Sequence, residues 1–356
     1  MVTFCDAAPT VRAVSSDWPG VRLHVVTGKG GTGKSTVAAS LALALASHGQ
    51  DVLLCEVEGR QGIARMFDVD PLPYAERRIA TGLRDPDRGE AGSGVVHALH
   101  IDAEAALMEY LAMYYRLGRA GRALDRFGVI EFATTIAPGV RDVLLTGKVY
   151  EAVKRNSRNR GATEYDAVVL DAPPTGRITQ FLNVSDELAG LAKVGPIKNQ
   201  ADTMMGLFRS PRTAVHFVTV LEEMPVQETA DGIAHLREAG LPVGGVVVNQ
   251  VRPRDLRVKD LAAARAGSLD RAGIAADLTT AGIGVDDSPD NSADDLLDAL
   301  LSEAQDHAVR RALEDAQRKL VKELDVPSYE LPRLAQGVDL GALYELAAQL
   351  RDQGLA

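Results

Sequence analysis

The stretch Gly28-Lys29-Gly30-Gly31-Thr32-Gly33-Lys34-Ser35-Thr36 decides how this chain folds. It follows an apolar run, Leu23 to Val26, and precedes a helix-forming run, Val37 to Ser47, that stops at Gly49. A strand, a glycine-rich loop and a helix in this order are the context that a phosphate-binding loop requires. The spacing G-x-x-x-x-G-K-S therefore predicts a P-loop α/β domain that binds a nucleotide. The alternative is a glycine-rich turn without a ligand.

The glycines and the polar residues of this loop have separate tasks. Where there are no side chains, the backbone can curl with its N–H groups facing inward around phosphate oxygens. The helix that follows directs its positive dipole end at the same anion. Lys34 is suited to neutralise the β- and γ-phosphates, and Ser35 to offer its hydroxyl to Mg²⁺. We predict that the phosphates bind to Gly30, Gly31, Thr32, Gly33, Lys34, Ser35 and Thr36.

A second nucleotide-handling segment, Asp171 to Gly176, follows the apolar strand Ala167 to Leu170. An aspartate at the end of such a strand can hold the hydration shell of Mg²⁺, which is the Walker-B role. The prolines and the glycine that follow shape a loop that can respond to the γ-phosphate. We predict Ser35 and Asp171 as the metal-binding pair, with ATP or ADP and Mg²⁺ as cofactors. The alternative for Asp171 is a turn or helix-capping residue.

Composition restricts the class of protein. The 356 residues are 46% hydrophobic but only 4% aromatic, which suits an α/β protein with a buried parallel sheet. The net charge of −10 argues against a nucleic-acid partner, because sequence-independent binding of nucleic acid needs a basic surface. No apolar run reaches the roughly 18 residues of a membrane span, so no integral membrane segment is expected.

The cysteines and the N-terminus point to a cytoplasmic protein. Cys5 and Cys55 are the only two cysteines, so no disulfide framework is implied and a reducing compartment fits. The N-terminus lacks the basic start and apolar stretch of a secretory signal. Residues 1–19 are predicted to form a flexible arm that ends near Pro19-Gly20.

Residues 20–356 are predicted to form one P-loop domain with a doubly wound, mostly parallel sheet. Helical insertions at residues 103–155 and 185–212 are expected to form a small subdomain. Residues 81–94 read as a surface loop, and residues 255–323 as charged and helical with an acidic loop near Asp286–Asp294. The predicted strands are 23–26, 51–55, 95–101, 167–170, 215–220, 245–248 and 326–331, and the other predicted helices are 226–239 and 340–351.

Lys29, directly after the first glycine, is not part of an ordinary phosphate loop. A second lysine there resembles the deviant loop of a class of dimeric ATPases. That class includes arsenite-pump ATPases, tail-anchored-protein-targeting ATPases, nitrogenase iron protein, and the septum-site and partitioning ATPases. Its signature lysine crosses the dimer interface and touches the partner's nucleotide. The resemblance implies that Lys29 stabilises charge on the transferred phosphoryl group from outside. The alternative is a solvated loop lysine.

The segment after the second strand-end aspartate narrows the resemblance. Asp171 to Leu182, D-A-P-P-T-G-R-I-T-Q-F-L, closely resembles the switch II segment D-T-A-P-T-G-H-T-L-R-F-L of the arsenite-pump and targeting ATPases. The stretch Pro138 to Asp142 resembles the P-G-x-x-E stretch at the family's dimer interface. The match runs from residue 21 to about 350 and is weakest in residues 185–212 and 255–300.

The same resemblance locates the adenine. Val246 to Gln250, V-V-V-N-Q, resembles the family's V-V-N-Q strand end. Its asparagine, here Asn249, is implied to hold the base, since an amide can both donate and accept hydrogen bonds. Leu331 to Val338 resembles the adenine-side loop, which implies that Pro332 and Arg333 contact the nucleotide.

Switch I is the first departure from the family. The family reads S-T-D-P-A-H, and its aspartate orients the attacking water. In register, this chain has Glu56-Val57-Glu58-Gly59-Arg60-Gln61, so Glu58 keeps a carboxylate on a longer arm. Ångström-scale misplacement can cost about a hundredfold in rate, so hydrolysis is expected to be slow or to depend on a partner. The alternative is that Glu58 is a solvated loop acid.

The second departure is the absence of metal and metalloid cysteines. The targeting ATPases clasp their dimer with a C-x-x-C zinc site, and arsenite pumps bind As(III) through thiolates. Cys5 and Cys55 cannot supply either set, so arsenite transport is disfavoured. Cys55 ends an apolar strand and is predicted to be a buried core thiol.

In the targeting ATPases, helical insertions from both subunits form a groove for an apolar client helix. Residues 103–127 and 185–212 occupy those chain positions here. Methionine often lines adaptable hydrophobic grooves, and the alternative is that these methionines pack the insertions together. Four of the seven methionines lie in the two segments: Met108, Met113, Met204 and Met205.

The resemblance thus implies a cytosolic dimeric ATPase whose nucleotide state captures or releases an apolar or protein client, such as a membrane-protein segment. The partner subunit is either a second copy or a paralogous ATPase. One alternative is a septum- or partitioning-type positioning ATPase, although the tail Leu340–Ala356 lacks the basic amphipathic character of a membrane anchor. The other is a non-catalytic, nucleotide-bound subunit of a hetero-oligomer. The predicted catalytic residues are Lys29, Lys34, Glu58 and Asp171.

Overall fold

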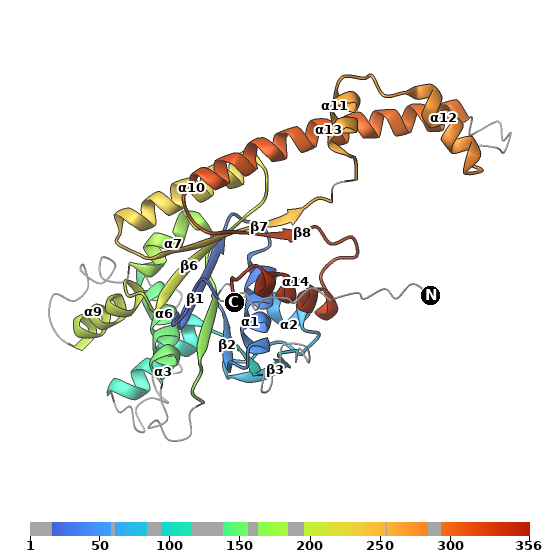
Figure 1. The fold of residues 1–356 in the computed structure, drawn as a ribbon. Coiled ribbons are helices and arrows are strands. Elements are labelled where there is room, and N and C mark those ends of the chain that lie inside the picture. The colour runs from blue at the N-terminus through green and yellow to red at the C-terminus, as the bar shows by residue number, and fades with distance from the viewer. Residues whose placement is uncertain are drawn as a thin grey trace, which may run out of the picture.

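An eight-stranded sheet forms the centre of the molecule (Figure 1). The computed structural model describes residues 16–57, 61–83, 94–115, 138–155, 163–183, 196–253, 255–283 and 293–356. In this part of the chain the strand order is β3-β4-β2-β5-β1-β6-β7-β8, and only the β3–β4 pair is antiparallel. The strands are β1 (Leu23–Gly28), β2 (Val52–Glu56), β3 (Arg77–Thr81), β4 (Val95–His100), β5 (Ala167–Asp171), β6 (Thr213–Thr219), β7 (Val243–Val251) and β8 (Ser328–Pro332).

Helices cover both faces of the sheet and close two separate cores. Successive side chains of a strand point to opposite faces, so Leu23 and Val25 of β1 join one core and Val26 joins the other. The predicted doubly wound α/β fold is thereby confirmed. One face carries α1 (Lys34–Ser47), α2 (Gly62–Met66) and α14 (Leu340–Asp352), and the other carries α6 (Pro138–Lys154), α7 (Thr175–Leu182), α9 (Pro196–Phe208) and α10 (Glu223–Glu238).

The sheet edge departs from the prediction. The sequence analysis did not predict the edge strand β3, because the sequence Arg-Arg-Ile-Ala-Thr has no apolar alternation. In the structure none of its side chains is fully buried. The five-residue helix α2 is missing as well. The predicted loop at residues 81–94 begins inside β3, and residues 84–93 lie outside the described part. The other predicted strands, and the helices predicted near residues 37–47, 226–239 and 340–351, are present with ends shifted by three residues or fewer.

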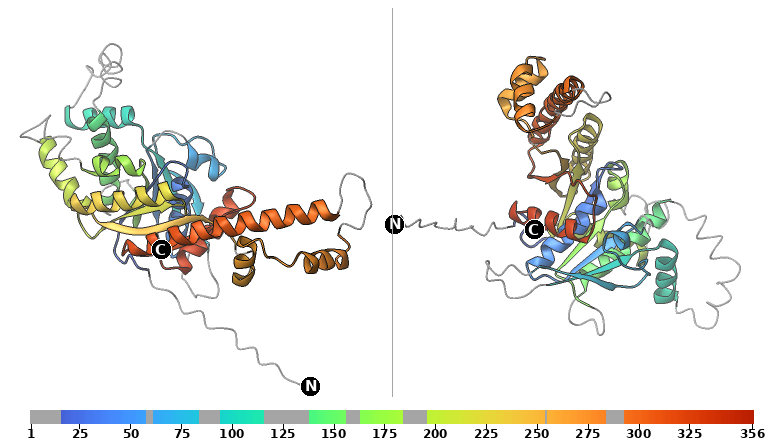
Figure 2. Two further views of the ribbon diagram at one scale, coloured as in Figure 1. Left: turned by 90° about the horizontal axis from the view of Figure 1, so that it is seen from above. Right: turned by 90° about the vertical axis from the view of Figure 1, so that its right-hand side faces the viewer.

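Between β7 and β8 the chain leaves the body as a helical arm (Figures 1 and 2). Two shorter helices, α11 (Val258–Arg265) and α12 (Arg271–Thr280), pack along α13 (Ala293–Glu323), whose 31 residues span about 46 Å. The arm confirms the predicted charged helical region, while most of the predicted acidic loop falls on residues outside the described ranges. Among the helices described, none has both the length and the apolar character needed to cross a membrane.

The helical insertions pack against one face of the sheet. α3 (Ala103–Tyr115) and α9 both contact α6, which lies next to β5. Met204 and Met205 of α9 are 1% and 4% exposed and belong to the same core as Leu145 of α6. Their burial fits the packing alternative rather than a methionine-lined groove. Met108 is half-buried, and the side chain of Met113 lies outside the described part.

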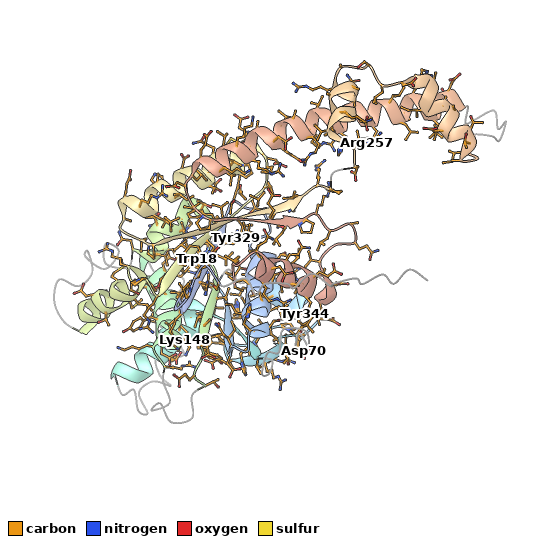
Figure 3. All side chains as sticks on the ribbon, viewed as in Figure 1. Trp18, Asp70, Lys148, Arg257, Tyr329 and Tyr344 are labelled. Atoms are coloured by element: carbon orange, nitrogen blue, oxygen red, sulfur yellow. The ribbon has the colours of Figure 1, made fainter. Side chains whose placement is uncertain are left out.

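The chain joins the body before the boundary predicted at residue 19. Trp18 donates a hydrogen bond through Nε1 to the hydroxyl of Tyr329 (3.0 Å), and that hydroxyl donates to Asp17 (2.6 Å). Figure 3 labels Trp18 and Tyr329 at this contact. The Trp18 ring also meets His216 edge-on, with 5.2 Å between ring centroids. Residues 16–19 are therefore part of the body, while residues 1–15 lie outside the described part.

Beneath Trp18, two histidines are buried side by side. His24 and His216 are 2% and 0% exposed, and Nδ1 of His24 lies 3.1 Å from Nε2 of His216. The N–H of Gly245 donates to Nδ1 of His216 (3.1 Å), so the proton of that ring sits on Nε2 and is donated to His24. Burial lowers the pKa of His24 to about 4 and the pKa of His216 well below its usual value. Both rings are therefore neutral in the folded protein.

This pair predicts a loss of stability in mild acid. The unfolded histidines take up protons near pH 6.5, whereas the folded ones resist protonation down to about pH 4 or below. The free energy of unfolding should be nearly constant between about pH 7 and pH 8. It should fall by about 1.5 kcal/mol per histidine between pH 6.5 and 5, above the range in which ordinary carboxylates titrate.

Urea denaturation at a series of pH values measures the effect. The variant His235→Gln, which removes an exposed histidine of α10, serves as the control and should keep the wild-type profile. A wild-type unfolding free energy that stays constant from pH 7 to pH 5 would contradict the prediction.

Candidate functional site

The phosphate loop connects β1 to α1 at the carboxyl edge of the sheet. Gly31 and Gly33 have φ angles of 90° and 91°, a left-handed conformation that glycine adopts without strain. Thr32 is buried, and its hydroxyl donates to the carbonyl of Lys29 (2.9 Å), which closes the turn. Gly33 caps α1 and leaves the N-terminal N–H groups of that helix without a side-chain cap. Such a loop with uncapped N–H groups is suited to bind an anion.

Asn249 supports this loop from below. It ends the buried part of β7 and donates through Nδ2 to the carbonyl of Thr32 (2.9 Å). A Cβ at position 33 would lie 2.3 Å from that Nδ2 atom, so Gly33 is required by this contact as well as by its φ angle. The structure therefore gives Asn249 a task in holding the loop that the sequence did not indicate, and contact with adenine stays a prediction.

The predicted metal-binding pair comes together. Ser35, in the first turn of α1, donates its hydroxyl to Oδ2 of Asp171 at the end of β5 (2.5 Å). Thr27 of β1 donates to the carbonyl of Pro173 (2.7 Å), which ties the segment after Asp171 to the phosphate loop strand. A hydroxyl and a carboxylate are oxygen ligands of the kind that Mg²⁺ prefers, completed by water and by phosphate.

Among the described residues no group of three or more His, Cys, Asp or Glu side chains could hold a metal ion. Cys55 is fully buried and free, and burial raises its pKa, so the predicted core thiol is confirmed.

The two lysines of the loop have different surroundings. Lys34 is the first residue of α1 and half-buried. Lys29 lies on the rim, where its Nζ is 3.4 Å from Oε2 of Glu228 on α10 of the same chain. Both side chains of this ion pair are about a third exposed, at 33% and 30%. An ion pair this exposed is weak, so Lys29 remains available to another partner.

The predicted switch I carboxylate, Glu58, lies outside the described residues. Its neighbour Glu56 is a site residue that the sequence analysis did not single out. Glu56 is 2% exposed, and its Oε1 accepts a hydrogen bond from the N–H of Gly62 (2.7 Å). A Glu at the position where the family has serine was the available signal, but only the structure shows that the side chain is buried.

The residues predicted to contact adenine lie on or next to β7 and β8, the last two strands in the order of the sheet. Pro332 ends β8 opposite Val251 of the neighbouring strand β7, and the N–H of Arg333 donates to the carbonyl of Val251 (2.8 Å). Asn249 and Pro332 thus lie near the carboxyl ends of two adjacent strands. The Arg333 side chain is exposed. The structure brings these residues near one another, and their contact with adenine stays a prediction.

The stretch predicted to lie at a dimer interface forms the first turn of α6. Asp142 in this stretch is only 3% exposed and forms an ion pair with Arg177 of α7, with oxygen–nitrogen distances of 3.1 and 3.3 Å. Its carboxylate therefore serves a contact within the chain. Because α7 directly follows the Asp171 segment, this pair connects the nucleotide site to the helical insertions.

Comparison with known proteins agrees with this geometry. Residues 21–211 match the model of the family described as anion-transporting ATPase. "ATPase BagA" of Mycobacterium tuberculosis and "Putative ATPase Mb3704" of Mycobacterium bovis are each 51% identical over 345 residues, covering 96% of this chain and 97% of the relative.

More distant relatives match a smaller share of the chain. "ATPase get3" of Pyrenophora tritici-repentis is 28% identical over 57% of this chain and 55% of its own length. "Putative arsenical pump-driving ATPase 2" of Aquifex aeolicus is 21% identical over 66% of this chain and 82% of its own length. Because the family model covers more than half of the chain and full-length relatives are 51% identical, this chain belongs to the anion-transporting ATPase family and is an ATPase.

Proposed function

We propose that this ATPase works as a Mg²⁺-dependent dimer whose nucleotide state controls the capture and release of a protein client. The observation that carries the proposal is the meeting of the phosphate loop, Ser35 and Asp171 at one point of the sheet edge. The chain has only two cysteines, Cys5 and Cys55, and the Cys55 thiol is buried and free, which supports a reducing, cytosolic compartment.

In this proposal residues 30–36 bind the phosphates and Asn249, Pro332 and Arg333 face the adenine. Lys34 and the N-terminus of α1 stabilise the negative charge that grows on the phosphates as the γ-phosphoryl group leaves. Ser35 and Asp171 would hold Mg²⁺, which would neutralise part of the phosphate charge. The chemistry asked of the protein is therefore mostly electrostatic.

Glu58 orients the attacking water, and Lys29 acts on the nucleotide of the partner subunit. The position of Lys29 on the loop rim supports this division, because its ammonium is turned to α10 and not into its own loop. The dimer is then needed for turnover and not for nucleotide binding.

Client control requires a path from the nucleotide to the helical insertions. Asp171 begins the segment that leads into α7, and Arg177 of α7 holds the buried Asp142 of α6. A shift of α7 would either move α6 with it or stretch the ion pair between Arg177 and Asp142. Since α6 contacts α3 and α9, the insertions would follow.

A nucleotide-bound subunit without catalysis is the second candidate, favoured by the departure at Glu58. Single-turnover hydrolysis with and without candidate partner proteins separates the two. Phosphate release by the protein supports the first candidate, and stable retention of ATP under all conditions supports the second.

The two loop lysines should give different phenotypes on substitution. Lys34→Ala should weaken ADP binding at least about tenfold, because phosphate charge inside the loop loses its counter-charge. Lys29→Ala should bind ADP as the wild type does, yet turn over at least about tenfold more slowly. Mixing the two variants should restore part of the activity, because a mixed dimer keeps one intact site facing one intact Lys29.

Fluorescent-ADP titration and steady-state phosphate release measure these effects. Wild-type turnover in Lys29→Ala would show that this lysine is idle. Turnover per subunit that does not change on dilution to monomer concentrations would show that no partner subunit is needed.

The adenine assignment predicts a difference between two ligands. Asn249→Ala removes the support of the Thr32 carbonyl, so binding of both ATP and inorganic triphosphate should weaken. ATP should lose the larger factor, by at least about fivefold, because only ATP also loses the amide contact to the base. Competition titrations against fluorescent ADP give both affinities. An equal loss for the two ligands would confine Asn249 to its role under the loop.

The metal assignment predicts a shift in Mg²⁺ dependence. Asp171→Asn keeps the size of the side chain but removes the charge, so the Mg²⁺ concentration for half-maximal turnover should rise at least about tenfold. ADP binding in the presence of a chelator should stay unchanged and serves as the control. An unchanged Mg²⁺ requirement would remove Asp171 from the metal site.

A further inference from the structure

Glu56 ends β2 as a buried carboxylate to which the proposed reaction assigns no task. It is in register with His100 on β4 and with Asp171 on β5, so three ionisable residues stand side by side along the carboxyl edge. The middle one, Glu56, is only 2% exposed. Burying a carboxylate destabilises the folded state unless hydrogen bonds or an opposite charge compensate for the lost hydration. The contacts of Glu56 therefore indicate what it does.

The two oxygens of Glu56 have unequal surroundings. Oε1 accepts the hydrogen bond from Gly62, the first residue of α2, at 2.7 Å. Oε2 faces Nδ1 of His100 at 3.8 Å, beyond hydrogen-bond distance, and within the described residues both atoms lack a hydrogen-bond partner. One charge-assisted bond to a backbone N–H is therefore the principal contact of this side chain.

That bond joins the two sides of switch I. On the near side, Val57 directly after Glu56 is 3% exposed. On the far side, Gln61 exchanges two hydrogen bonds with the backbone of Leu72, at 2.8 and 3.1 Å. Both flanks of residues 58–60 are thus attached to the body, and the hydrogen bond from Gly62 to Glu56 links them.

We propose that Glu56 is a positioning residue for hydrolysis: by holding Gly62 it fixes the separation of Val57 and Gln61, the two residues that flank the segment carrying Glu58. This task requires a hydrogen-bond acceptor of the right length and not a negative charge. The inference rests on the proposed function, in which Glu58 orients the attacking water.

Three substitutions separate acceptor, length and charge. Glu56→Gln keeps an acceptor for Gly62 and also offers an amide donor to Nδ1 of His100, so its turnover should stay within about threefold of wild type. Glu56→Ala removes the acceptor and Glu56→Asp withdraws it, so both should turn over at least about tenfold more slowly. ADP affinity should stay within about threefold in all three variants, since the phosphate loop is untouched. His100→Gln is the matched control and should keep wild-type turnover, because Glu56 makes no hydrogen bond to His100.

A double variant tests whether Glu56 acts through Glu58. Glu56→Ala combined with Glu58→Gln should be no slower than Glu58→Gln alone, because the residue to be positioned is already lost. Multiplying effects would overturn the inference. Equal losses in Glu56→Gln and Glu56→Ala would show that the charge matters and would overturn it too, as would wild-type turnover in Glu56→Ala.

Two safeguards keep the experiment decisive. If thermal melting shows that Glu56→Ala does not fold, the comparison of Glu56→Asp with Glu56→Gln gives the answer, with a slow Asp variant and a normal Gln variant expected. Failure of the proposed function looks different, since wild-type protein would then release no phosphate with Mg²⁺ and ATP. If only this inference fails, the wild-type protein still hydrolyses ATP, and Glu56→Gln, Glu56→Asp and Glu56→Ala turn over at equal rates.

Discussion

The hydrogen bond from Asn249 to the carbonyl of Thr32 is the contact on which the shape of the phosphate loop depends. It joins residues 217 positions apart in the chain, so the loop takes its shape only when β7 is in place beside β6 and β1. The contact fits only because position 33 has no side chain. A local sequence motif thus becomes a binding site through a support from the other half of the protein.

The parallel sheet explains why the other site residues meet. Parallel strands end at one common edge, and loops from that edge converge on a ligand at the point where the strand order reverses. Here β1 stands between β5 and β6, so the phosphate loop opens between the end of the Asp171 strand and the half of the sheet that supplies Asn249. The in-register row of His100, Glu56 and Asp171 continues the same edge away from the loop.

The helical insertions and the helical arm differ in how they are connected to this carboxyl edge of the sheet. The insertions are bound to it through α7, because Arg177 pairs with the buried Asp142. The arm of α11, α12 and α13 is inserted between β7 and β8 and projects away from the body, with α13 in contact with α10 (Figures 1 and 2). It lies beyond the residues that match the family model. Most of the exposed large apolar side chains among the described residues lie on that arm: Val258, Ile283, Leu296, Leu300, Val309, Leu313 and Leu320. The family match, residues 21–211, therefore covers the phosphate loop and Asp171, while the arm lies outside it.

The sequence by itself determined the fold class, the phosphate loop, the Ser35–Asp171 pair and most strands. These features are local: a central parallel strand is an apolar run, and a P-loop is a fixed spacing of glycine, lysine and serine. The edge strand β3, the burial of Glu56 and the contact of Asn249 with the phosphate loop came only from the tertiary structure. Each depends on neighbours far along the chain, since β3 is defined by pairing with β4, and Glu56 is buried by the strands on both sides of it. Spacing within one segment carries no information about such neighbours, and that is why only the folded chain could reveal them.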